Sequence, residues 1–148
     1  MPKTDVGAGC AIVVFNKNHE FYMLKRPMHL SHHPGVYCLP GGWIEKNEAT
    51  LDAGRREVKE EFGVSVKAIK VVGLSDNIIP SENHHTISAL MVAMLADGET
   101  PINAEPDKSD ECICLPFSRF YDIPRPIFCD YAANMSMLEI EKFLEENC

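Results

Sequence analysis

The sequence predicts an α+β fold in which helices and a mixed set of strands pack as an α/β/α layered domain. Three observations predict it. Short apolar runs separated by turn residues, which are typical of strands, occur along most of the chain. Helix signals are confined to two distant segments, at 50–62 and from Ser136 onward. The 148 residues suit one hydrophobic core and contain no repeat or linker, so residues 1–148 are expected to form a single domain.

The N-terminal part of the chain is predicted to form a β-hairpin followed by a short strand. Residues 10–15 are continuously apolar, residues 16–19 are typical of a turn, and residues 20–25 supply the return strand. A short strand at 37–39 is expected to stop at the tripeptide 40–42, which contains a proline and two glycines.

Residues 50–62 are predicted to form the first helix. Thr50 can cap its N-terminus through the side-chain oxygen, and Gly63 is placed to end it. One apolar face is expected to pack on the core, and it consists of Leu51, Val58 and Phe62.

The C-terminal part of the chain adds three strands and a second helix. The strands are predicted at 66–79, 87–95 and 111–115, with a turn at 80–83 and a polar loop at 96–110. Ser136 and Glu139 have the spacing of a capping box, which predicts a helix that begins there and continues through Phe143.

Composition and charge exclude several classes of protein. The net charge is −8, which argues against binding duplex nucleic acid, because a basic face supplies most of that affinity. No apolar run approaches the roughly 20 residues that a membrane span needs. Residues 1–5 lack the start of a secretory signal, so a soluble cytoplasmic protein is expected.

Cysteines and histidines suggest metal chemistry at first sight, but their spacing does not favour it. The six cysteines include no Cys-x-x-Cys pair, so we expect reduced thiols, with a redox or metal role for Cys112 and Cys114 as the alternative. The histidines lie in polar loops without zinc spacing and are expected to be solvent-exposed or at the rim of a substrate site; they are His29, His32, His33, His84 and His85.

A second face of the first helix is acidic. Glu57, Glu60 and Glu61 are spaced at i, i+3 and i+4, so their side chains lie close together beside the apolar face. A bare cluster of this kind is most often a solvated surface. Hard divalent cations, however, bind clustered carboxylate oxygens, and Mg²⁺ commonly combines a few carboxylates with substrate phosphates. A cation would offset the repulsion among the three groups.

The residues around this cluster match a longer pattern. It runs Gly42-x5-Glu48-x7-Arg56-Glu57-Val58-x-Glu60-Glu61-x-Gly63-Val64. This pattern resembles a complete Nudix box, the signature of the Nudix (MutT-like) hydrolases, and no fixed position departs from it. The order of strands and helices outside the box is also similar to that family. The resemblance implies the Nudix fold, an α/β/α sandwich with a mixed sheet and the Nudix loop-helix-loop.

The resemblance also implies an activity and its cofactor. Nudix enzymes hydrolyse a nucleoside diphosphate linked to another moiety, using Mg²⁺, for which Mn²⁺ can substitute. By position, Glu57 and Glu61 would be metal ligands, and Glu60 would be a further ligand or the base that activates water. The carbonyl of Gly41 would complete the metal shell. Arg56 would orient the carboxylates through charge-assisted hydrogen bonds.

Glu48 would be a structural partner that ties the loop to the helix. Glu105 lies in the loop where many relatives supply a late metal ligand or base.

Residues outside the box are similar to those of MutT-related nucleotide triphosphate diphosphatases. By that similarity, Arg26 would contact substrate phosphate or base, with an exposed charge at a strand end as the alternative. Leu39 would line the nucleotide pocket, and Gly42 would allow close backbone approach. Trp43 would be either a loop anchor or a surface on which the substrate stacks. That subgroup also implies a possible homodimer.

The substrate is expected to be a nucleoside triphosphate, hydrolysed to a monophosphate and pyrophosphate. The alternative is ADP-ribose or another nucleoside diphosphate derivative, since Pro80 lies near a proline of the ADP-ribose enzymes. Residues 111–117 lack the tryptophans that the triphosphate subgroup carries there, which leaves the base preference open. A nucleotide-binding module without activity is a further hypothesis, although such modules usually lose box glutamates. An RNA decapping or regulatory role is another, but it would require an extended basic surface, and the net charge of −8 argues against it.

Overall fold

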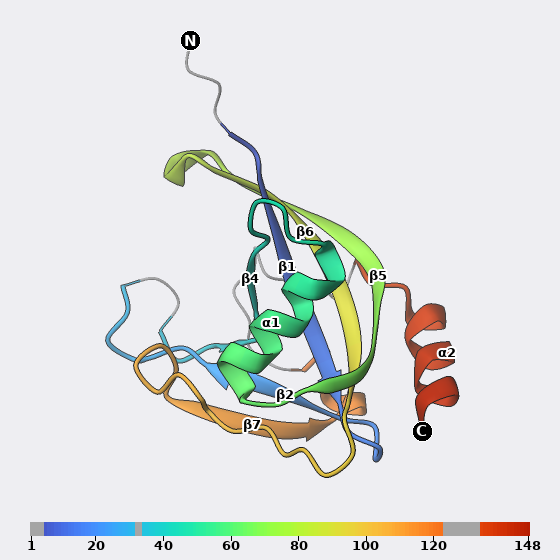
Figure 1. The fold of residues 1–148 in the computed structure, drawn as a ribbon. Helices are drawn as coiled ribbons and strands as arrows, with labels where there is room; N and C mark the ends of the chain where they lie inside the picture. The colour runs from blue at the N-terminus through green and yellow to red at the C-terminus, as the bar shows by residue number, and fades with distance from the viewer. Residues whose placement is uncertain (1–4, 32–33, 123–133) are drawn as a thin grey trace.

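A computed structural model describes residues 5–31, 34–122 and 134–148 of the chain (Figure 1). The strands are β1 (Gly7–Phe15), β2 (Glu20–Lys25), β3 (Tyr37–Cys38), β4 (Gly41–Trp43), β5 (Val66–Ile79), β6 (His84–Leu95) and β7 (Glu111–Pro116). The helices are α1 (Thr50–Phe62) and α2 (Met137–Asn147), with 3-10 turns at Pro80–Glu82 and Phe117–Arg119.

The strands form one mixed sheet. Its main order is β3-β2-β1-β6-β5, while β4 pairs with β1 and β7 pairs with β2. β1 and β6 are parallel over nine residue pairs, and the other pairings are antiparallel. In Figure 1, β5 and β6 run together as a long curved hairpin that extends beyond the body of the sheet.

Alternation along β1 divides the core into two layers. Cys10, Ile12 and Val14 contribute to a cluster that includes Val58 and Phe62 of α1. The intervening side chains of β1 contribute to a second cluster, which includes residues of α2. Successive strand residues point to opposite faces, so each helix covers one face of the sheet. Figure 1 shows α1 in front of the strands and α2 beyond β5. The predicted α/β/α layering is confirmed.

The first helix has the predicted bounds but a different N-cap. Ala49 occupies the cap position and makes no side-chain hydrogen bond, whereas Thr50 is the first helical residue. The prediction that Thr50 caps the helix is therefore wrong. At the other end Gly63 has φ of 69°, and its amide donates to the carbonyl of Lys59. Glycine adopts this left-handed conformation at the least steric cost because it lacks a Cβ, and the predicted end of the helix is confirmed.

Two strand predictions need correction. Gly41 and Gly42 do not merely stop the preceding strand, because with Trp43 they form β4, which pairs with residues 9–11 of β1. The strand predicted at 87–95 begins earlier, at His84, and its first residues pair with the end of β5. Residues 41–43 and 84–86 contain few apolar side chains. They are strands because their backbones pair with neighbouring strands, which the side-chain pattern does not reveal.

The C-terminal helix begins as predicted. The side chain of Ser136 accepts a hydrogen bond from the amide of Glu139 at 3.3 Å. Glu139 also pairs with Lys70 of β5, which fastens the first turn of α2 to the sheet. The helix continues beyond Phe143 to Asn147.

Cysteines and histidines of the described segments fit the expectations in part. Five cysteines are free thiols: Cys10, Cys38, Cys112, Cys114 and Cys148. Cys129, His32 and His33 lie outside the described residues. His29 is exposed, whereas His84 and His85 are partly buried. Within the described segments, neither helix has the length and apolar character needed to cross a membrane.

The close approach of β5 to the segment before α2 predicts a cost for any side chain at Gly73. A Cβ there would lie 2.1 Å from the carbonyl oxygen of Asn134, which is backbone and cannot rotate away. We expect Gly73→Ala to lower the free energy of unfolding by about 1–3 kcal/mol, measured by urea denaturation.

Gly54→Ala is the matched control. Its Cβ would meet the flexible ends of Met91 and Ile69, and alanine favours the helix by about 1 kcal/mol. Its unfolding free energy should stay within about 1 kcal/mol of the parent. A Gly73 variant as stable as the parent would contradict the tight approach.

Candidate active site

Three glutamates of α1 lie at different depths along the side of the helix that faces β4. Glu57 is buried, with 9% of its surface exposed, although it is charged. Glu61 is partly buried, and the side chain of Glu60 is half exposed. The helical spacing places them next to Val58 and Phe62, so the acidic groups begin where the apolar core ends.

The two glycines of β4 let the backbone pass between β1 and α1. A Cβ on Gly42 would lie 2.5 Å from the carboxylate of Glu57, and a Cβ on Gly41 would lie 2.1 Å from the carbonyl oxygen of Cys10. The amide of Gly41 donates to Oε2 of Glu61 at 2.7 Å. Both glycines are required because the backbone itself forms one wall of the acidic cluster.

Arg56 joins the loop before α1 to the helix. Its Nε and Nη2 donate to the two carboxylate oxygens of Glu48 at 2.7 and 3.0 Å, and Nη2 also donates to the carbonyl of Trp43 at 2.9 Å. The hydrogen bonds from Arg56 lower the pKa of Glu48 to about 2, while Glu48 and Glu57 raise the pKa of Arg56. A two-point pair of this kind fixes direction as well as distance. Glu48 is therefore a structural partner, as predicted.

The same guanidinium reaches the metal-binding candidates. Nη1 donates to Glu57 at 3.0 Å and lies 3.3 Å from Glu60. Arg56 thus holds two carboxylates on one side while it is held in turn by Glu48. This geometry is the one that the predicted orienting role requires.

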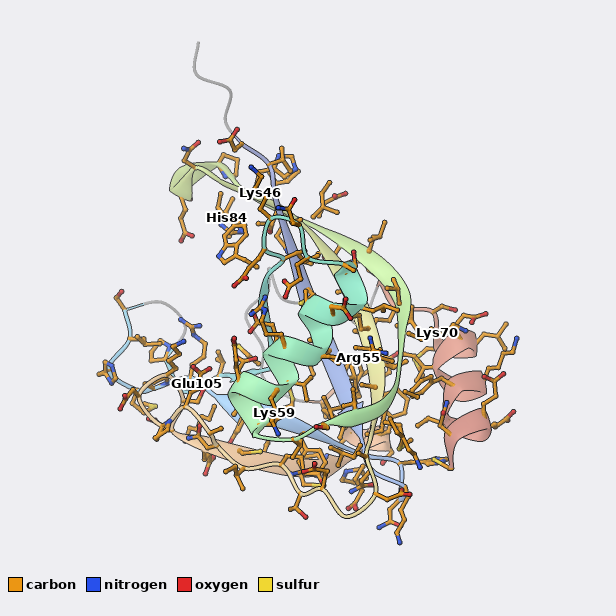
Figure 2. All side chains as sticks on the ribbon, in the orientation of Figure 1. Lys46, Arg55, Lys59, Lys70, His84 and Glu105 are labelled. Atoms are coloured by element: carbon orange, nitrogen blue, oxygen red, sulfur yellow. The ribbon has the colours of Figure 1, made fainter. Side chains whose placement is uncertain are left out.

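A loop between β6 and β7 brings a fourth carboxylate to the end of α1. The amides of Ile102 and Ala104 donate to the carbonyls of Phe62 and Glu61, at 3.1 and 3.0 Å. These bonds use carbonyls at the helix end, which have no partner within the helix. Glu105 follows directly, and Figure 2 shows it beside the last turn of α1. It pairs with Lys108 at 2.9 Å.

Burial and mutual repulsion disfavour the charged forms of these carboxylates. Burial raises the pKa of Glu61 to about 8, and the negative charges of Glu57 and Glu105 act in the same direction, while the hydrogen bond from Gly41 opposes them. Burial also raises the pKa of Glu57, against the effect of Arg56. The fold therefore keeps acidic groups together at an electrostatic cost.

The chemistry of this donor set fits a hard divalent cation. Oxygen ligands from clustered carboxylates suit Mg²⁺, and a positive charge between Glu57, Glu61 and Glu105 would offset their repulsion. Among the described residues, no three His, Cys, Asp or Glu side chains already converge on one point. In this arrangement Arg56 donates to Oε1 of Glu57, and the amide of Gly41 donates to Oε2 of Glu61. The metal-ligand roles remain predictions.

A cavity of about 260 Å³ lies beside β4, and residues of β1 and the two glycines of β4 line it. Its wall includes Leu39, Gly41, Gly42 and Trp43, to which the resemblance gave site roles, and also His84, which the sequence analysis expected to be exposed or at the rim of a substrate site. Arg26, at the end of β2, is not among the described residues that line it. The two glycines therefore adjoin both the acidic cluster and the cavity.

Trp43 is anchored, which is one of the two roles that the sequence left open, while stacking of a substrate on it stays a prediction. Its ring lies against Gly7, where a Cβ would be 2.0 Å from the indole, so the residue is anchored on β1. The ring is nevertheless 57% exposed and lines the cavity. The imidazole of His84 lies 6.2 Å away, centre to centre. His84, which is labelled in Figure 2, is the first residue of β6 and lines the same cavity.

Sequence reasoning missed the floor of the cavity. The polar side chains of Asn77, Thr86 and Ser88 line it from β5 and β6, beside Gly9 of β1. Thr86 and Ser88 alternate with other residues at the start of a strand that is apolar further on, and this break in the pattern is the signal that could have found them. The partner strand and the cavity could not be deduced from it.

A family model and two curated proteins resemble the chain. A model described as the NUDIX domain matches residues 5–126. The m7GpppN-mRNA hydrolase NUDT17 of Danio rerio is 26% identical over 125 residues, covering 74% of this chain and 41% of that protein. The NAD-capped RNA hydrolase NudC of Vibrio parahaemolyticus is 33% identical over 88 residues, covering 60% and 30%. The chain spans less than half the length of these relatives.

Solved structures share the fold over almost the whole chain. A MutT NUDIX hydrolase from Burkholderia pseudomallei has a TM-score of 0.70 and 20% identity, covering 97% of this chain and 98% of that one. The NUDIX domain of Shewanella oneidensis NrtR, solved with ADP ribose, has a TM-score of 0.67 and 16% identity, covering 99% and 92%.

The raised pKa of Glu61 predicts that this residue destabilises the metal-free protein. Between the ordinary value of 4.5 and about 8, the folded state retains a proton that the unfolded state releases, so stability falls as pH rises through this window. Glu61→Gln keeps an acceptor for the Gly41 amide and removes the titration. With EDTA present at pH 8, we expect the variant to have a higher melting temperature than the parent, corresponding to a gain of about 1–2 kcal/mol in the free energy of unfolding. At pH 5 the gain should be smaller.

Thermal unfolding at the two pH values measures both effects. Glu146→Gln, the same change on the exposed side of α2, should show no such pH-dependent difference. A Glu61 variant less stable than the parent at pH 8 would contradict the cause assigned to the shift.

Proposed function

The chain belongs to the Nudix family, and we propose that it hydrolyses a nucleoside triphosphate to a nucleoside monophosphate and pyrophosphate, using Mg²⁺ or Mn²⁺. The single observation that carries the proposal is the shared position of Gly41 and Gly42. They contact the carboxylates of α1 on one side and line the cavity on the other. A nucleoside in the cavity would then extend its phosphates toward the acidic cluster, where a cation can bind.

The residues that would hold the cation are those that the sequence predicted. Glu57 and Glu61 are proposed as ligands, with the carbonyl of Gly41 and with Glu60 as a further ligand or as the base. Glu105 is proposed as a late ligand or base. When bound, the cation would neutralise phosphate charge and lower the pKa of a water molecule, which makes that water a better nucleophile.

The protein's own contribution is position and charge. A water oxygen attacks a phosphorus atom of the anhydride, its proton passes to a carboxylate such as Glu60 or Glu105, and the bridging oxygen leaves with pyrophosphate. Arg56 sets the direction of Glu57 and lies close to Glu60. Phosphoryl transfer depends mainly on such positioning, since little covalent chemistry is left to the protein.

A nucleoside diphosphate linked to another group is the second candidate substrate. The two curated relatives are named as hydrolases of m7GpppN-mRNA and of NAD-capped RNA, and the NrtR domain was solved with ADP ribose. These names favour an anhydride between two nucleotide-like halves. Product analysis with nucleoside triphosphates and ADP-ribose separates the candidates, because pyrophosphate is released only from the former.

We propose the remaining partners from the charge of the chain and from its resemblance to the family. The net charge of −8 supports small anionic substrates held through a cation rather than duplex nucleic acid. A homodimer and a cytoplasmic location remain predictions.

Loss of a cluster carboxylate should remove turnover. We expect Glu60→Gln and Glu61→Gln each to lower kcat at least a hundredfold with Mg²⁺ and a nucleoside triphosphate, because both groups act mainly in the transition state. Glu146→Gln on α2 is the matched control and should retain parental rates. Pyrophosphate release measures all three variants.

Two outcomes would count against the proposal. Unchanged turnover in Glu60→Gln and Glu61→Gln would mean that the assigned roles are wrong. A parent protein that binds nucleotides but cleaves none with Mg²⁺ or Mn²⁺ would favour the binding-module hypothesis.

A further inference from the structure

Four polar side chains form a buried row on the β5–β6 hairpin. Ser75 is paired with Ser88 and Asn77 with Thr86, so all four lie on one face of the two strands. Each has only 5 or 6% of its surface exposed. Burying a polar group without a partner is costly, so four in one place require a network or a ligand. Elsewhere the same face of β6 is apolar.

The hydrogen bonds within the row have a direction. Ser75 donates to Oδ1 of Asn77 at 3.4 Å, and Nδ2 of Asn77 donates to Oγ1 of Thr86 at 3.3 Å and to Oγ of Ser88 at 3.1 Å. Both amide protons are therefore used on hydroxyl oxygens. Since each hydroxyl accepts from Asn77, its own proton must be donated to a different group.

The two hydroxyl protons have different destinations. Oγ1 of Thr86 lies 3.1 Å from Nε2 of His84, which can accept its proton. Ser88 lines the cavity beside Gly9, where a Cβ would lie 3.2 Å from the Ser88 hydroxyl. The absence of a side chain at Gly9 leaves that hydroxyl accessible from the cavity. Ser88 thus presents a directed donor to whatever occupies the cavity.

Aromatic and glycine residues complete the surroundings of this donor. Trp43 and His84 stand at one side of the cavity with their rings tilted at 55° to each other. A flat ring bound in this cavity would lie beside both Trp43 and the polar side chains of Ser88 and Asn77. Aromatic stacking together with edge hydrogen bonds is the usual chemistry by which proteins bind a nucleobase.

We propose that Ser88 recognises the heteroaromatic base of the substrate by donating a hydrogen bond to an acceptor on its edge, and that Asn77 is the positioning residue that aims this donor. Trp43 supplies the stacking surface. The chemical class recognised is a nucleobase with a carbonyl or unprotonated ring nitrogen toward the floor. This inference rests on the proposed function, because it assigns the base of the same nucleotide substrate.

A structural role for the row is the competing explanation. If the network only stabilised the hairpin, its loss would lower the melting temperature and affect every ligand alike. Recognition of a base instead predicts a change confined to ligands that contain one.

Trp43 allows binding to be measured without turnover, because it is the only tryptophan in the chain. The probes are the monophosphates of adenosine, guanosine, cytidine and uridine, added without metal to the parent protein. We expect at least one to quench the fluorescence of Trp43. Ribose 5-phosphate, which lacks a base, should compete poorly for the same site.

Two variants test the donor. Ser88→Ala removes it, and we expect the affinity for the quenching monophosphate to fall about three- to tenfold, with a similar rise in KM and little change in kcat. Asn77→Asp replaces the donating amide with acceptors, which turns the Ser88 proton away from the cavity, and should weaken binding at least as much. Affinity for ribose 5-phosphate should not change in either variant.

Matched changes at the tip of the same hairpin serve as controls. Ser81→Ala and Asn83→Asp make identical chemical substitutions at exposed residues and should bind like the parent. The inference is overturned if Ser88→Ala and Asn77→Asp bind every monophosphate as the parent does, if they lose ribose 5-phosphate to the same degree, or if no monophosphate binds.

The two proposals fail in distinguishable ways. A parent that hydrolyses nucleoside triphosphates while Ser88→Ala keeps its KM and affinity overturns base recognition alone. A parent whose monophosphate binding depends on Ser88, but which cleaves no anhydride with metal, overturns the proposed hydrolysis alone.

Discussion

The ion pair between Arg56 and Glu48 is the interaction on which the rest of the site depends. Glu48 holds one edge of the Arg56 guanidinium, so the remaining N–H groups can face Glu57, Glu60 and the carbonyl of Trp43. One side chain thereby sets the loop before α1, two carboxylates of the helix and the end of β4 relative to one another. Lysine could not replace it, since a single ammonium lacks the planar set of donors.

The same region concentrates charge that the fold alone does not neutralise. Burial and neighbouring charges raise the pKa of Glu61 to about 8, and burial raises that of Glu57. A protein selected only for stability would place amides or apolar groups here. Buried carboxylates with raised pKa values are common at sites where a bound ligand supplies a compensating positive charge. At Glu61 the same carboxylate therefore lowers the stability of the metal-free protein and serves the proposed activity.

The short strand β4 connects the chemistry to the recognition of substrate. Gly41 and Gly42 bring the backbone between β1 and α1, so the carboxylates and the cavity share these two glycines as neighbours. On the far side, the β5–β6 hairpin supplies Asn77, Thr86 and Ser88 from strands that are distant in sequence from the box. The proposed cleavage and the proposed base recognition thus involve separate elements of the fold, α1 for the first and the β5–β6 hairpin for the second.

The sequence by itself determined the helix from Thr50 to Phe62, its glycine end and the three glutamates of one face, because these depend on local spacing and conformation. It also predicted where most strands lie along the chain, although not their order in the sheet. Only the tertiary structure decided that Ala49 rather than Thr50 is the N-cap, and that Gly41 and Gly42 pair as a strand. It alone placed Asn77 and Ser88 in the cavity, since pairing in register between β5 and β6 is a long-range contact that no local pattern encodes.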